Sequence, residues 1–139
     1  MTTAENRRLM QAIFAGLARG DGALFVESLA DEVTMRVTGQ YSWSRTFSGK
    51  SSLLRDLYGY VRTRLAEPGK TVAERFIADG DLVVVEARGE MLTREGVRYD
   101  NDYCLIYRLA AGKIVEIREY QDSHLCERVL GPFPGATTA

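Results

Sequence analysis

The C-terminal half of the sequence constrains the fold most, because it holds four extended segments in succession and no helical periodicity before residue 123. The segments span residues 71–78, 82–92, 97–109 and Lys113–Gln121. Short turns between strands of this length predict an antiparallel meander. The turn signals are Asp79-Gly80-Asp81, Arg94-Glu95-Gly96 and Ala110-Ala111-Gly112.

The N-terminal half has the periodicity of helices. Apolar spacing predicts helices over residues 4–19, 22–30 and 50–65, and alternation predicts a strand over 33–38. Thr2 and Glu5 have the spacing of a capping box, and a last helical turn, Ser123–Leu130, follows Asp122 as its N-cap. The predicted fold is α+β, with three N-terminal helices packed on one face of a curved antiparallel sheet. A pocket between these layers is the expected site for a small molecule.

The length and composition narrow the possible functions. We expect one domain over residues 1–131 and a flexible C-terminal tail over 132–139. The net charge of −1 lacks the basic excess that nucleic acid binding needs. No run is long and apolar enough to span a bilayer, so we expect a cytoplasmic protein. Two cysteines and one histidine are too few for a zinc site, and we expect neither metal nor cofactor.

Five short segments carry a family resemblance across nearly the whole chain. Together, the five segments named below make the sequence resemble the nuclear transport factor 2-like fold. Within that fold, the sequence is most similar to the SnoaL-like branch, which also includes ketosteroid isomerases and limonene epoxide hydrolases. The resemblance implies a cone-shaped fold whose members include enzymes, binders and interaction modules. The segments are Ala18-Arg19-Gly20-Asp21, Ala30-Asp31-Glu32-Val33, Ser48-Gly49-Lys50, Tyr99-Asp100-Asn101-Asp102-Tyr103 and residues 112–122.

The resemblance to ketosteroid isomerases does not extend to their catalytic groups. The position of their tyrosine corresponds to Ile13, that of their carboxylate base to Val37, and that of their second aspartate falls near Leu105. Because an aliphatic side chain cannot take up a proton, steroid isomerisation is not expected.

Two other branches place a carboxylate on the last strand. The acid/base aspartate of SnoaL-like cyclases corresponds to Glu119. The Arg-x-Asp pair of limonene epoxide hydrolases resembles Arg88 and Glu90, and their second aspartate again falls near Glu119. The resemblance therefore implies Glu119 as a proton-transfer residue, with Arg88 and Glu90 as possible partners.

Strand alternation supports Glu119 independently. It places Glu119 on one face with Val115, Ile117 and Gln121. A carboxylate on an apolar face is desolvated, so its pKa rises toward neutral pH, which suits a general acid or base. The alternative is a structural ion pair with an arginine such as Arg88.

Alternation is less favourable to the other polar candidates. Arg88 and Glu90 lie opposite Val83 and Val85, which favours a solvated or dimer-facing stripe over a hydrolase site. Asn101 shares a face with apolar and aromatic residues. Its amide needs a hydrogen-bonding partner, which could be Glu119, a water or a ligand, so Asn101 joins the candidate catalytic residues as a group that orients substrate or water.

Six aromatic residues are the expected ligand contacts. Tyr41 and Trp43 precede the third helix and form either a lid over the pocket or, for Trp43, a plug in the core. Three functions remain open: a cavity isomerase, cyclase or hydrolase for an apolar oxygenated molecule, a non-catalytic binder of a small apolar ligand, or a homodimeric interaction module. The six residues are Phe14, Tyr41, Trp43, Tyr58, Tyr99 and Tyr103.

Overall fold

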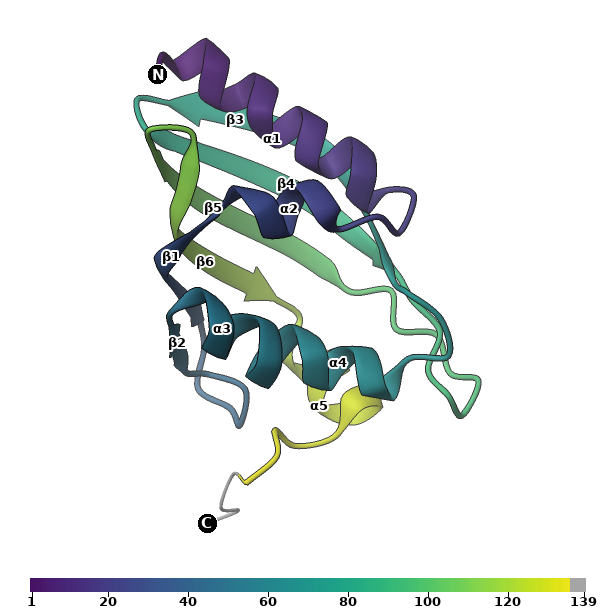
Figure 1. The fold of residues 1–139 in the computed structure, drawn as a ribbon. Helices are drawn as coiled ribbons and strands as arrows, with labels where there is room; N and C mark the ends of the chain where they lie inside the picture. The colour runs from purple at the N-terminus through teal and green to yellow at the C-terminus, as the bar shows by residue number, and fades with distance from the viewer. Residues whose placement is uncertain (136–139) are drawn as a thin grey trace.

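The computed structural model describes residues 1–135 and has the predicted α+β architecture. Helices α1, α2 and the α3–η1–α4 segment lie on one face of a curved sheet (Figure 1). The helical elements are α1 (Thr3–Leu17), α2 (Ala23–Ser28), α3 (Lys50–Ser52), η1 (Leu53–Tyr58), α4 (Gly59–Arg64) and α5 (Ser123–Leu130). The strands are β1 (Leu29–Val37), β2 (Thr46–Ser48), β3 (Lys70–Asp79), β4 (Leu82–Glu90), β5 (Asp102–Ala110) and β6 (Lys113–Gln121).

The sheet is mixed rather than purely antiparallel, which corrects the prediction. Its strand order is β2-β1-β6-β5-β4-β3, and β1 runs parallel to β6. The three turns of the C-terminal half force β3 to β6 to be antiparallel. No turn links β1 to β6, because most of the chain separates them, so their direction is set by packing instead.

Local signals fix most helix and strand ends. The Thr2 hydroxyl accepts a hydrogen bond from the Glu5 amide and caps α1, and the Asp122 carboxylate accepts one from Leu125 and caps α5. The observed β5 starts at Asp102, five residues later than predicted. The preceding residues still pair with residues 89–93 through the Leu92–Arg98 bridge and backbone hydrogen bonds, but the pairing is irregular, and the Asp100 carboxylate accepts from the Met91 amide. The long third helix is interrupted by the π-helical segment η1.

A β-bulge in β6 changes which residues face the core. Ile114 and Ile117 are both fully buried, whereas Val115 is only partly buried. The register shifts between Arg108 and Leu109 of the neighbouring strand, so Val115 is the extra residue. The prediction that Val115 shares the inner face was therefore wrong, but the alternation from Ile117 to Glu119 and Gln121 holds.

The chain beyond residue 131 is packed as far as Phe133. Phe133 is buried, its ring meets that of Trp43 edge-on at 5.1 Å, and the Arg45 guanidinium lies 3.7 Å from its centre. The Trp43 indole N–H donates to the Gly131 carbonyl at 2.9 Å. Within the tail predicted over residues 132–139, Phe133 is thus packed against the core, and residues 136–139 lie outside the described part of the chain. Among residues 1–135, none of the helices could cross a membrane.

Candidate functional site

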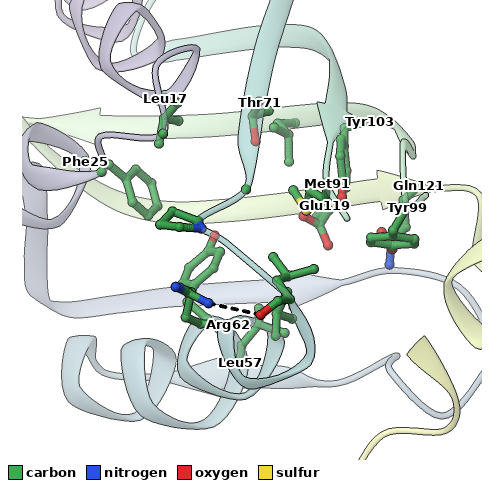
Figure 2. A pocket seen from close by; sticks show the side chains of 18 of the residues that line it. Leu17, Phe25, Leu57, Arg62, Thr71, Met91, Tyr99, Tyr103, Glu119 and Gln121 are labelled. Atoms are coloured by element: carbon green, nitrogen blue, oxygen red, sulfur yellow. Dashed lines mark hydrogen bonds between the residues drawn. The ribbon is translucent and has the colours of Figure 1, made fainter. Parts of the chain in front are cut away.

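A cavity of about 360 Å³ lies between the helices and the inner face of the sheet (Figure 2). Most of its lining is aliphatic or aromatic and comes from α1, α2, the η1–α4 segment, β5, β6 and α5. The lining residues Val26, Arg62 and Pro68 are exposed, so the mouth opens beside α2 and the end of α4. Arg62 lies there and donates a hydrogen bond to the Leu65 carbonyl at 3.2 Å. An apolar cavity of this size fits a small organic molecule.

Glu119 projects into this cavity from β6. Its direct neighbours across the sheet are Val37 on β1 and Leu105 on β5, which are both buried aliphatic residues. Within residues 1–135, its carboxylate oxygens form no hydrogen bond or ion pair with protein groups. Burial without a compensating partner raises the pKa of Glu119 to about 7. The side chain is therefore poised to gain or lose a proton near neutral pH.

Arg88 does not pair with Glu119. It lies on the outer face of β4, where its guanidinium is 3.6 Å from the Glu90 carboxylate and both side chains are largely exposed. The inner positions of β4 are occupied by buried Val83, Val85 and Ala87. Strand alternation thus turns Arg88 and Glu90 away from the cavity, and the structure does not assemble the arginine–carboxylate set of an epoxide hydrolase around Glu119.

Three tyrosines surround Glu119. Tyr103 and Tyr107 flank Leu105 on β5, so both are diagonal neighbours of Glu119 on the inner face. Tyr58 enters from η1. Burial, and after it the nearby Glu119 charge, raises the pKa of each of these phenols, so all three remain protonated hydrogen-bond donors at neutral pH.

Asn101 has a structural role in the described chain. It is fully buried, and its side-chain oxygen accepts hydrogen bonds from the backbone amides of Asp102 and Asp122. Its amide nitrogen lies within hydrogen-bonding distance of Tyr99, Gln121 and the Asp122 carbonyl. Because these contacts use the capacity of the amide on both sides, and because Asn101 does not line the cavity, it has no group free for a substrate.

Five of the six expected ligand contacts line the cavity, namely Phe14, Trp43, Tyr58, Tyr99 and Tyr103. Tyr41 lies behind the wall, where its hydroxyl accepts a hydrogen bond of 2.6 Å from Gln121. Trp43 lines the cavity but is buried and packs against Phe133, which fits the plug alternative better than an exposed lid. Sequence reasoning did not single out Tyr107 and Gln121 as site residues. Tyr107 lies two residues after Leu105, and Gln121 lies two residues after Glu119. Strand alternation therefore places both on the inner face, and this was a usable signal.

The sequence model of the SnoaL-like domain matches residues 10–117 of this chain. The protein belongs to the SnoaL-like family. The match begins within α1, covers the elements from α2 to β5 and the first half of β6, and stops two residues before Glu119. No curated protein matches the sequence.

Solved structures share the fold of this SnoaL-like protein at low sequence identity. A candidate SnoaL-like polyketide cyclase from Jannaschia sp. CCS1 aligns with a TM-score of 0.74 and 15% identity over 93% of each chain. Bal32a, from a soil-derived mobile gene cassette, aligns with a TM-score of 0.77 and 17% identity over 91% of this chain and 97% of its own. TerC, co-crystallized with polyporic acid, aligns with a TM-score of 0.74 and 20% identity over 90% and 97%.

Proposed function

We propose that this SnoaL-like protein binds a small apolar molecule that carries a carbonyl or hydroxyl oxygen, and that Glu119 moves a proton on it. The observation that carries the proposal is a carboxylate in an apolar cavity, without a protein partner among the described residues, whose pKa is raised to about 7. A structural carboxylate at such a position would be expected to have a cation or several donors beside it.

The reaction that fits best is proton abstraction from carbon. Above its pKa, the Glu119 carboxylate removes a proton from a C–H bond next to a carbonyl, and the bonding electron pair moves to the carbonyl oxygen to form an enolate. Return of the proton to a different carbon isomerises the substrate, and attack of the enolate carbon on a second carbonyl closes a ring. Both outcomes need one base and a dry, shaped cavity.

The hydrolase alternative has less support. Epoxide opening would need a water held between two charged groups, and Arg88 and Glu90 lie on the outer face of β4. Two fold relatives favour an oxygenated substrate, since one is a candidate polyketide cyclase and the other was co-crystallized with polyporic acid. These relatives share only the fold at this identity, so they guide the choice of probes.

Deuterium exchange tests the proton transfer directly. Benzoylacetone is an apolar β-diketone with one acidic carbon, and its exchange in D₂O can be followed by proton NMR. We expect the protein to accelerate exchange, and Glu119→Gln to lower the rate at least about 100-fold, the usual contribution of a general base. Glu116→Gln, in the same strand, is the matched control and should exchange at the wild-type rate.

Binding is measured separately through Trp43, which is the single tryptophan and lines the cavity. Polyporic acid should quench its fluorescence in the wild type and in Glu119→Gln. Quenching in both proteins together with equal exchange rates would overturn the catalytic proposal and leave a non-catalytic binder. A lack of quenching and of exchange acceleration would contradict both functions.

A further inference from the structure

Tyr58 reaches the floor of the cavity beside Glu119. Its hydroxyl donates to the sulfur of Met35 at 3.4 Å, which places the phenol oxygen over β1. Met35 pairs with Ile117, and Val37, the next inward residue on β1, pairs with Glu119. The Tyr58 hydroxyl therefore lies on the β1 side of Glu119, whereas Tyr103 and Tyr107 lie on the β5 side.

The hydroxyl of Tyr58 keeps most of its donor capacity. A thioether is a weak acceptor, so exchanging Met35 for a substrate oxygen would strengthen the hydrogen bond. A developing negative charge on that oxygen would strengthen it further, because hydrogen bonds to ions in a dry site are the stronger ones. Burial raises the pKa of Tyr58, which keeps the phenol protonated while it donates.

The helix is built to hold Tyr58 in this position. Tyr58 ends the π-helical segment η1, whose last hydrogen bond runs from the Gly59 amide to the Leu54 carbonyl, five residues back. A Cβ at residue 59 would lie 2.9 Å from that carbonyl oxygen, so the π turn depends on glycine there. Phe25 packs edge-on against the Tyr58 ring at 5.5 Å. Interruptions of this kind in a helix are frequent at functional sites.

We propose that Tyr58 is a catalytic residue, whose hydroxyl donates the hydrogen bond that stabilises the substrate oxygen as it becomes an enolate. This inference rests on the proposed function, and it adds the orientation of the substrate in the cavity. The reacting C–H faces Glu119, and the carbonyl oxygen points toward β1 and η1. The preferred substrate class is a ketone or β-dicarbonyl compound whose carbonyl group is bonded to the carbon that loses the proton.

The first test binds an enolate analogue. In the Glu119→Gln protein, residue 119 mimics the protonated carboxyl left after proton transfer, and 2-naphthol supplies an apolar ring system with one acidic oxygen. Isothermal titration calorimetry should show about tenfold weaker 2-naphthol binding when Tyr58→Phe is added, the effect of losing one hydrogen bond to a partly charged group. Tyr120→Phe on the outer face, in the same background, should change the dissociation constant less than twofold, and Tyr107→Phe should weaken binding less than Tyr58→Phe does.

The second test measures benzoylacetone exchange in Tyr58→Phe with Glu119 intact. We expect the maximal rate to fall about 100-fold with little change in KM, because the hydrogen bond strengthens only as charge develops. Unchanged 2-naphthol binding in Tyr58→Phe, a larger effect from Tyr107→Phe, or no binding to the Glu119→Gln parent would overturn the role of Tyr58. An exchange rate that survives Glu119→Gln would instead overturn the proposed function, so the two failures are distinguishable.

Discussion

At the scale of single residues, the raised pKa of Glu119 links the site to stability. Its ordinary value is 4.5 and its value in the folded chain is about 7, so between these two pH values the folded protein holds a proton that the unfolded chain releases. The free energy of unfolding must therefore fall as pH rises from about 4.5 to about 7, and this contribution then stays constant at higher pH.

Glu119→Gln should remove the loss of stability that comes from ionising a buried carboxylate. We expect the variant to gain stability relative to the wild type between pH 5 and pH 8, by about 2 kcal/mol once solvent in the cavity is allowed for. Urea denaturation at both pH values measures the difference. Glu116→Gln, which changes the outer face of β6, should keep the same offset from the wild type at both pH values. Parallel pH dependences for the wild type and Glu119→Gln would show that the carboxylate is not desolvated.

Asn101 gives the second prediction at this scale. Replacing it with alanine removes the hydrogen bonds that the buried Asn101 side chain makes with the backbone of Asp102 and Asp122, which should cost about 2–4 kcal/mol of unfolding free energy. Chemical denaturation measures the loss. Below the denaturation midpoint, benzoylacetone exchange should stay within a few-fold of the wild type, because Asn101 does not line the cavity. A 100-fold loss of exchange in a stably folded Asn101→Ala protein would return Asn101 to the catalytic set.

At the scale of elements, the π turn makes an unusual prediction for Gly59. In an ordinary helix, Gly→Ala adds about 1 kcal/mol of stability. Here the new Cβ would lie 2.9 Å from the Leu54 carbonyl oxygen, so Gly59→Ala should destabilise the protein or force η1 into α-helical geometry. Both outcomes should displace Tyr58 and weaken 2-naphthol binding in the Glu119→Gln background. Ser51→Ala, an exposed change in the same helix, is the control, and its thermal midpoint should match or exceed the wild type.

The same elements show what local sequence patterns can predict. The bounds of β6 and α5 follow from alternation, from Asp122 and from Gly131, which are all signals within a few residues. Alternation also places Glu119 inward and Arg88 outward. The parallel pairing of β1 with β6 and the packing of Phe133 depend on residues far apart in the chain, and no local pattern encodes them.

The candidate site divides in the same way. The inward direction of Glu119 is a property of its own strand, so the sequence alone predicts it. Besides its near neighbours Tyr99 and Asp102, Asn101 bonds to Gln121 and Asp122, about 20 positions away. Only the folded chain shows that these bonds occupy its amide on both sides. The closeness of Tyr58 to Glu119 likewise needs the helical layer to be docked on the sheet.

At the scale of the whole molecule, the outer face of the sheet lacks a cover in the described chain. Ile77, Val84 and Ile106 pair across β3, β4 and β5 and form one apolar row, and the Ile77 side chain is 48% exposed. Ion pairs border this row, between Arg75 and Glu86 and between Asp81 and Arg108. We propose that a second copy of the chain covers the row in a homodimer, since an apolar centre with a charged rim is typical of such interfaces.

Ile106→Arg tests this homodimer. In a two-fold symmetric interface the substitution places two arginines near each other without partners, so the dimer should dissociate. Light scattering after gel filtration should give twice the chain mass for the wild type and a single chain mass for the variant. A protein concentration of about 10 µM is above the dissociation constant of a dimer of moderate affinity. Val97→Arg, an exposed change in the turn before β5, should remain dimeric. Because the row faces away from the cavity, Ile106→Arg should still bind polyporic acid, and a monomeric wild type would refute the homodimer without affecting Glu119 or Tyr58.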